Sequence, residues 1–152
     1  TAYPVQTLRK VIESAQIDTV LSYCRYCLND TTLLSVRSLV ESTGIGLMNA
    51  SPFAMGLLTE QGPYPWHPAS QEVHDTCRAA VQHVQERGED IAKLALQFAL
   101  QADWIPTTVV GGSTPEHVRQ SLAWIQEPMN EELLDQVAGL LDANTKRARH
   151  TG

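Results

Sequence analysis

The chain has 152 residues, of which 43% are hydrophobic and 18% charged, and its formal net charge is −6; these values predict a single soluble globular domain. No apolar run reaches the roughly 18 to 20 residues that cross a bilayer, and residues 1–8 lack the basic and apolar regions of a signal peptide. Acidic residues are scattered without a basic stripe, so we expect a cytoplasmic protein whose partners include neither a membrane nor nucleic acid.

The first half of the chain alternates helical and strand patterns. Residues 5–14 repeat apolar side chains at helical spacing, whereas residues 17–24 form a short run rich in β-branched and aromatic residues. An apolar stripe over residues 33–40 predicts a helix that ends near Gly44, and residues 45–50 predict a second strand directly after it. This order is typical of a parallel sheet with helical crossovers.

The second half begins with a long loop and then continues the alternation. Residues 53–69 contain two glycines and three prolines, and loops of this length in compact domains are usually functional or disordered. Ser70 and Asp90 stand at cap positions of two helices, the second covering residues 91–101. Residues 104–110 predict the third strand.

Two further helices are predicted after the third strand. Thr114 as cap with Pro115 at the first helical position is a specific helix start. We expect the core-facing stripe of this helix to be Val118, Leu122 and Ile125. Asn130 caps the last helix. Its inward-facing residues are expected to be Leu134, Val137, Leu140 and Leu141.

The cysteines predict neither a disulfide framework nor a metal site. Cys24 and Cys27 form a C-x-x-C pair, but on a strand a spacing of three places them on opposite faces, and we expect both to pack as small apolar residues. His74 and Cys77 lie three apart on a predicted helix, without a second pair to complete a metal site.

Residues 1–143 therefore predict one α/β domain with three parallel strands and five to six helices, followed by a polar, frayed tail over residues 144–152. Three parallel strands leave two open edges, and their apolar runs require cover on both faces. The chain also begins without Met, in a helix that no strand precedes. We expect a piece of a larger protein, or a sheet that another chain completes.

Segments distributed over nearly the whole chain carry a family resemblance. They are residues 18–24 (DTVLSYC), 26–30 (YCLND), 49–58 (NASPFAMGLL), 62–63 (GP), 66–70 (WHPAS), 94–97 (LALQ) and 110–111 (VG). Together they resemble the last half of an aldo-keto reductase and, within that family, the L-galactose dehydrogenase branch of aldose dehydrogenases. The resemblance implies the C-terminal half of an eight-stranded (β/α) TIM barrel, with these strands as its sixth, seventh and eighth and the active site at their carboxyl ends.

The resemblance assigns no catalytic residue to this chain. The catalytic Asp, Tyr, Lys and His of the family lie on earlier strands and loops than those present here, and none of the five histidines matches the catalytic one. We therefore expect the chain alone to be inactive.

The resemblance instead implies that the chain contains much of a nicotinamide-cofactor site. Tyr23 matches a strand residue near the nicotinamide amide, and Ser51, Phe53 and Met55 match a loop whose backbone surrounds the pyrophosphate and ribose. Packing inside the barrel is the alternative for Tyr23, and an ordinary strand-ending turn is the alternative for Ser51. Ala50 stands where the family has an aromatic ring that stacks on nicotinamide, which a methyl group cannot do.

A second cofactor segment opens the helix after the third strand, where exposed N–H groups and the positive helix end suit an anion. The residues that the resemblance assigns to the adenosine phosphate and the adenine are Gly111, Gly112, Ser113, Thr114, His117, Gln120 and Ser121. Members that prefer NADP carry Lys and, six residues later, Arg, where this chain has Gly111 and His117. A 2′-phosphate would lose its charge-assisted partners, so we expect NAD rather than NADP.

The long loop and the missing half leave several functions open. Trp66 offers an aromatic face to the C–H side of a sugar, with a packing anchor as an equal alternative, and His67 is interpreted as a surface residue.

Three functions stay open for the chain. The first function is the cofactor-binding half of an oxidoreductase that oxidises an aldose similar to L-galactose to its lactone, with the sugar and a missing N-terminal half-barrel as partners. The second is a non-catalytic nucleotide-binding or regulatory module of the same fold, and the third is a half-barrel that associates with itself through its open edges.

Overall fold

The computed structural model describes residue 1 and residues 4–148, with side chains placed as far as residue 142. The helices are α1 (Val5–Ser14), α2 (Arg37–Thr43), α3 (Gln71–Gln85), α4 (Ile91–Leu100), α5 (Pro115–Trp124) and α6 (Glu131–Ala148), with 3₁₀ turns at Thr32–Val36 and Ala54–Gly56. The strands are β1 (Thr19–Tyr23), β2 (Gly46–Ala50) and β3 (Thr107–Val109). In the described part of the chain no helix is both long and apolar enough to cross a membrane.

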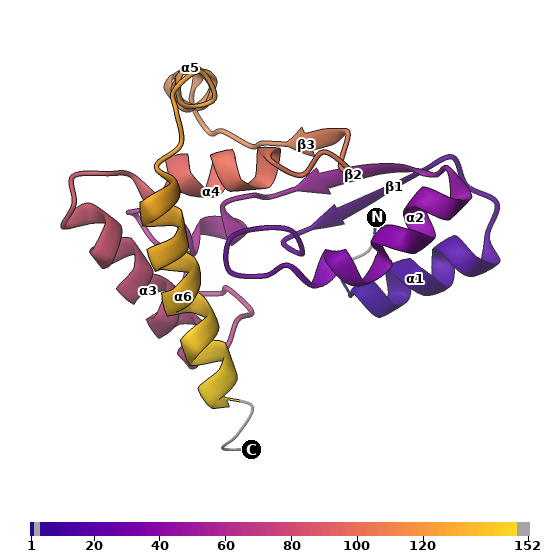
Figure 1. The fold of residues 1–152 in the computed structure, drawn as a ribbon, viewed down its shortest axis with the longest axis horizontal. Coiled ribbons are helices and arrows are strands. Elements are labelled where there is room, and N and C mark those ends of the chain that lie inside the picture. The colour runs from indigo at the N-terminus through magenta and orange to yellow at the C-terminus, as the bar shows by residue number, and fades with distance from the viewer. Residues whose placement is uncertain (2–3, 149–152) are drawn as a thin grey trace.

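The three strands form one parallel sheet in the order β1-β2-β3, which confirms the expected α/β class. Tyr23 pairs with Ala50, and Ala50 pairs with Val109, so the last residues of the three strands are level. Figure 1 shows the strands side by side with their carboxyl ends on the same side of the sheet.

One face of the sheet is covered by helices and the other is only partly covered. Val20 of β1 and Leu47 of β2 are buried in a core with Leu8 of α1 and Val40 of α2, and Figure 1 places α1 and α2 together beside this face. The side chains that alternate with Val20 and Leu47 along the strands point to the opposite face of the sheet. On that second face Leu21, Tyr23 and Met48 are only half-buried, so a face expected to be covered in a parallel sheet stays partly accessible.

A second core lies where α3, α4 and α6 pack together. Val84 of α3, Ile91 of α4 and Val137 of α6 are fully buried in it, and α3 and α6 lie alongside each other in Figure 1. Leu133, which the sequence pattern did not select, is buried here, whereas Leu134 and Leu140 are half-buried.

The predicted helix starts are confirmed by their side-chain hydrogen bonds. The capping oxygens of Ser70, Asp90, Thr114 and Asn130 accept backbone N–H groups of their helices at 3.4, 2.8, 3.2 and 3.1 Å. These bonds satisfy donors that the first helical turn leaves free.

The predicted core-facing stripe of α5 is wrong. Val118, Leu122 and Ile125 are 52%, 58% and 41% exposed. In Figure 1 α5 stands apart from the sheet, with α4 as its nearest neighbour. An amphipathic pattern identifies an apolar stripe but not the surface that covers it.

Two element boundaries also differ from the sequence prediction. β3 is limited to Thr107–Val109, because Trp104 and Ile105 pack into the core around α1 instead of extending the strand. α6 continues to Ala148, past the expected end at residue 143, and residues 149–152 of the predicted tail lie outside the described residues.

The difference in burial between β2 and α5 gives a stability prediction. Leu47→Ala removes a side chain that is 1% exposed, and we expect it to lower the free energy of unfolding by about 2–5 kcal/mol. Leu122→Ala makes the same change on the exposed face of α5 and should alter it by no more than about 0.5 kcal/mol. Urea denaturation measures both values, and equal losses would show that the α5 stripe is packed in solution.

Candidate functional site

The candidate site lies along the edge where the three strands end. The Cys24 N–H donates to the Ala50 carbonyl at 3.1 Å, and the Ser51 N–H donates to the Val109 carbonyl at 3.3 Å. These two bonds continue the sheet for one residue beyond the strands, so the segments that follow β1, β2 and β3 leave it together. In α/β folds, ligands bind at this carboxyl edge.

Unusual backbone geometry is concentrated at the same edge. Within the described residues, the non-glycine residues with positive φ are Cys24 (57°), Ser51 (60°), Ala54 (49°) and Met55 (54°). The first two directly follow β1 and β2, and the other two lie in the turn after Ser51. Such residues are strained unless surrounding structure holds them, and they cluster at functional sites.

The side chains of Cys24 and Ser51 face each other across the edge. Burial raises the pKa of the Cys24 thiol, and the Ser51 side chain only partly opposes this. The thiol is therefore neutral at physiological pH and acts as a polar packing partner rather than a nucleophile.

The strand assumption made for the C-x-x-C pair is wrong. β1 ends at Tyr23, and Cys27 instead forms a reciprocal backbone bridge with Asp30, with both hydrogen bonds at 2.9 Å. Both cysteines are nevertheless buried and form no disulfide, as packing residues would. Among the described residues, no group of three or more His, Cys, Asp or Glu side chains is arranged to hold a metal ion.

Polar side chains beneath the edge fix the turn that follows β1. The fully buried Asn49 donates its amide N–H to the Tyr26 carbonyl at 3.0 Å, which joins the end of β2 to that turn. Arg25 forms a half-buried ion pair with Asp30 at 2.7 Å, and Asp30 accepts the Thr32 N–H at 2.9 Å. Sequence reasoning assigned no role to Asn49, although a lone amide in an apolar strand is the signal that could have revealed one.

The segment between β3 and α5 offers an open surface. A Cβ atom on Gly112 would lie 3.2 Å from the Cβ of His117, so glycine permits the close approach of the helix, whereas Gly111 has no atom within 4 Å of the corresponding point. The hydroxyl of Ser113 and Nδ1 of His117 are 3.2 Å apart, and the side chains of residues 111–120 are all exposed. The geometry suits an anionic group that approaches from solvent.

The structure brings only some of the predicted cofactor-binding residues together. Tyr23, Ser51 and Gly111 lie within two residues of the hydrogen-bonded strand ends. Gln120 and Ser121 lie further along α5, about 9 Å or more from its capping residue at 1.5 Å per residue. The described contacts do not connect these two with the strand ends.

The long loop is fastened back onto the strand edge. Ala54 donates its N–H to the Ser51 carbonyl at 2.9 Å, and Nε2 of His67 lies 3.2 Å from the Ala54 carbonyl. Nδ1 of the same ring accepts the Ala69 N–H at 3.2 Å, so Nε2 must carry the proton and donate. His67, which the sequence analysis interpreted as a surface residue, is partly exposed, and its ring also joins both ends of the loop.

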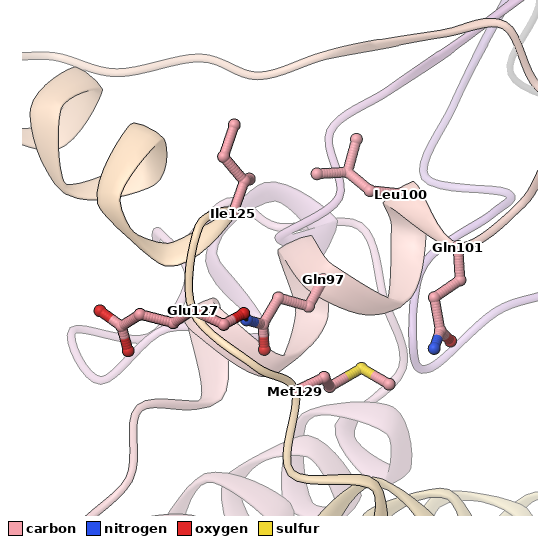
Figure 2. Close-up of a pocket in the computed structure, with 6 residues that line it drawn as sticks. All are labelled: Gln97, Leu100, Gln101, Ile125, Glu127 and Met129. Atoms are coloured by element: carbon pink, nitrogen blue, oxygen red, sulfur yellow. The ribbon is translucent and has the colours of Figure 1, made fainter.

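A cleft of about 170 Å³ lies elsewhere, against α4. Figure 2 shows the Gln97 amide of α4 pointing toward Glu127, with Leu100 and Gln101 at the end of this helix and Ile125 and Met129 on the facing segment. The amide of Gln97 donates to the carbonyls of Trp124 and Glu127 at 2.8 and 2.9 Å. Leu100 and Gln101 belong to the helix end that leads into the start of β3, so this cleft is separate from the edge where the strands end. The two hydrogen bonds of Gln97 secure the turn between α5 and α6.

Comparisons with known proteins agree with this geometry. The sequence pattern of the Aldo/keto reductase family matches residues 1–142. The chain is 44% identical over 130 residues to L-galactose dehydrogenase of Arabidopsis thaliana, covering 83% of this chain and 41% of that protein. It is 33% identical over 110 residues to D-arabinose 1-dehydrogenase of Saccharomyces cerevisiae, covering 70% of this chain and 32% of that protein.

Solved structures show the same fold. The holo form of the aldo-keto reductase AKR11C1 from Bacillus halodurans superposes with a TM-score of 0.65 at 19% identity, covering 88% of this chain and 44% of that chain. The glycerol dehydrogenase AKR11B4 from Gluconobacter oxydans gives 0.59 at 13% identity, covering 91% and 46%. The chain thus spans less than half the length of the proteins it matches.

The hydrogen bonds of His67 make the long loop sensitive to acid. Burial lowers the pKa of His67 below its ordinary value of 6.5, the Ala54 carbonyl opposes this, and His74, whose ring centroid is 5.2 Å away, lowers it further. The unfolded chain therefore binds the proton more readily, and the contribution of His67 to stability is present above about pH 6.5 and lost as the pH falls through the lower folded value. We expect amide hydrogen exchange in residues 54–69, corrected for intrinsic rates, to accelerate over this range.

Two variants separate His67 from other acid effects. His67→Gln has no titrating ring, so the acceleration should disappear. His74→Gln removes the side chain that further lowers the pKa of His67, so the acceleration should remain but be smaller and level off at a higher pH. The same acid response in His67→Gln as in the unaltered chain would contradict this role.

Proposed function

Because the chain belongs to the aldo/keto reductase family, whose members use nicotinamide cofactors, we propose that it is the C-terminal, cofactor-binding half of an NAD-dependent cytoplasmic enzyme that oxidises an aldose to its lactone. The two most similar relatives named above are sugar dehydrogenases. The observation that carries the proposal is the strained, hydrogen-bonded carboxyl edge at Cys24 and Ser51. Preorganised backbone of this kind suits a ligand that needs many main-chain contacts.

The chain's residues fit one end of such a cofactor better than the other. Gly111, with open space around it, and the capped start of α5 suit the adenosine phosphate. Ser51, Phe53 and Met55 would surround the pyrophosphate and ribose. When bound, the nicotinamide supplies the hydride acceptor. Tyr23 would lie beside its amide, since it is level with Ala50 at the strand ends.

The absence of an aromatic ring at position 50 favours a second function. Ala50 has no ring face to place against the nicotinamide, which would leave the reactive end of the cofactor poorly positioned. A non-catalytic nucleotide-binding module of the same fold would tolerate this. The two functions differ in turnover rather than in nucleotide binding.

Among the described residues, β1 and β3 each pair with β2 alone, and this together with the partly accessible sheet face supports the proposal that further protein completes the sheet. The N-terminal half of a barrel would pair with β1 and β3 and cover Tyr23 and its neighbours. That half would also contribute the catalytic residues. A second copy of this chain is the other possible partner.

The enzyme proposal is tested by measuring NADH formation with a panel of aldoses. The full-length protein that contains this chain should oxidise at least one aldose, and the chain alone should show no turnover. Turnover by the chain alone would contradict the proposed absence of catalytic groups. A full-length protein that binds NAD without oxidising any aldose would favour the non-catalytic module.

The preference for NAD is tested by supplying the two charges that a 2′-phosphate needs. The Gly111→Lys/His117→Arg double variant should bind NADP more than roughly 100-fold more tightly, since its two charge-assisted hydrogen bonds contribute about 1.5–3 kcal/mol each, while NAD affinity should change little. The open space at Gly111 accommodates the lysine. Isothermal titration of the full-length protein measures both affinities.

A matched control separates the phosphate contact from a general change of charge. Ala123→Lys adds a positive charge at an exposed position of α5, away from the helix start, and should leave the NAD to NADP ratio unchanged. Tighter binding of NADP than NAD by the unaltered protein would show that Gly111 and His117 do not set the preference.

A further inference from the structure

Two large aromatic side chains in the long loop are exposed and stacked on each other. Tyr64 and Trp66 are 69% and 66% exposed, with ring centroids 5.7 Å apart and ring planes 6° from parallel. Each ring covers one face of the other, so each keeps one outer face open. A contiguous exposed apolar surface of this kind, unlike a single exposed residue, indicates a binding surface.

The loop holds the two rings on a fixed support. Pro63 and Pro65 flank Tyr64 and restrict the backbone on both sides. Leu58 anchors the preceding segment in the core, and a Cβ atom on Gly56 would lie 3.0 Å from the Gly62 carbonyl oxygen, so two parts of the loop touch. Binding to this surface therefore requires little ordering of the loop.

The same support ties the loop segment that carries the rings to the candidate site. Trp66 is adjacent to His67, whose Nε2 donates to the Ala54 carbonyl, and Ala54 donates in turn to the Ser51 carbonyl. Two successive hydrogen bonds thus connect His67, the neighbour of Trp66, with Ser51 at the end of β2. His67 acts here as a positioning residue.

The composition of the loop indicates the chemistry of its ligand. Between residues 51 and 70 the only Asp, Glu, Lys or Arg is Glu60, so the rings have no cationic neighbour in the loop to attract a phosphate. An aromatic face attracts the polarised C–H bonds of a sugar ring, whose hydroxyl groups at the ring edge stay free for other partners. A neutral polyhydroxylated ligand fits this surface better than a charged one.

We propose that Tyr64 and Trp66 together form a platform for the C–H face of the aldose ring, with His67 holding the platform against the end of β2. This inference rests on the proposed sugar dehydrogenase function. It assigns to the stacked pair the role of setting substrate affinity, separate from the cofactor segments at Ser51 and Gly111. Tyr64 supports the Trp66 ring by stacking, so its ring matters and its hydroxyl does not.

The platform is tested in the full-length protein by steady-state kinetics. Trp66→Ala should raise the KM for the aldose about three- to tenfold, as loss of an aromatic contact does, with kcat within about twofold and the KM for NAD unchanged. Trp66→Phe should restore most of the loss. Tyr64→Ala should raise the aldose KM by a smaller factor, and Tyr64→Phe should leave it unchanged.

Leu34→Ala provides a matched control, because Leu34 is also exposed but lies in the 3₁₀ turn after β1. It should alter neither KM. An unchanged aldose KM in both alanine variants would overturn the platform, as would an equal rise in the KM for NAD.

A wild-type protein that oxidises no aldose would refute the proposed function, and the platform is then tested by binding alone. Saturation-transfer NMR with methyl β-D-galactopyranoside should give a signal that Trp66→Ala abolishes and Leu34→Ala keeps. No signal from the unaltered protein, or a signal that survives Trp66→Ala, would overturn the platform.

Discussion

Hydrogen bonding between the ends of three parallel strands determines where the candidate residues beside those ends lie. The pairing of Tyr23 with Ala50 and of Ala50 with Val109 makes the strand ends level, and the bonds at Cys24 and Ser51 extend this pairing by one residue. Three segments of unrelated sequence consequently leave the sheet at one edge. A change of register in one strand would separate them and turn its side chains to the other face.

The strained residues next to this edge depend on the same pairing. A left-handed backbone at Ser51 is unfavourable in an isolated chain and persists because surrounding bonds hold it. Those bonds come from β3 on one side and from the long loop through Ala54 on the other. The loop is fastened in turn by His67. The edge therefore depends on contacts among segments far apart in the sequence.

Local sequence signals predicted the elements well, and the long-range contacts poorly. The caps at Ser70, Asp90, Thr114 and Asn130 and the helix Val5–Ser14 follow from interactions within a few residues, and the structure confirms them. The exposure of the α5 stripe and the end of β1 before Cys24 depend on distant surfaces and turns, so periodicity alone could not supply them. The role of His67 likewise depends on a carbonyl thirteen residues away.

The accessible face of the sheet and the uncovered stripe of α5 have a common physical cause. Parallel strands need cover on both faces, and an amphipathic helix needs a surface for its apolar stripe, yet the described residues supply neither. The chain spans 41% of its relative from Arabidopsis thaliana, and under the proposed function further protein covers both surfaces. A nucleotide bound across the strand edge would then gain contacts from two halves. The strained edge described here would contribute its main-chain groups in a fixed geometry, without the entropic cost of ordering them on binding.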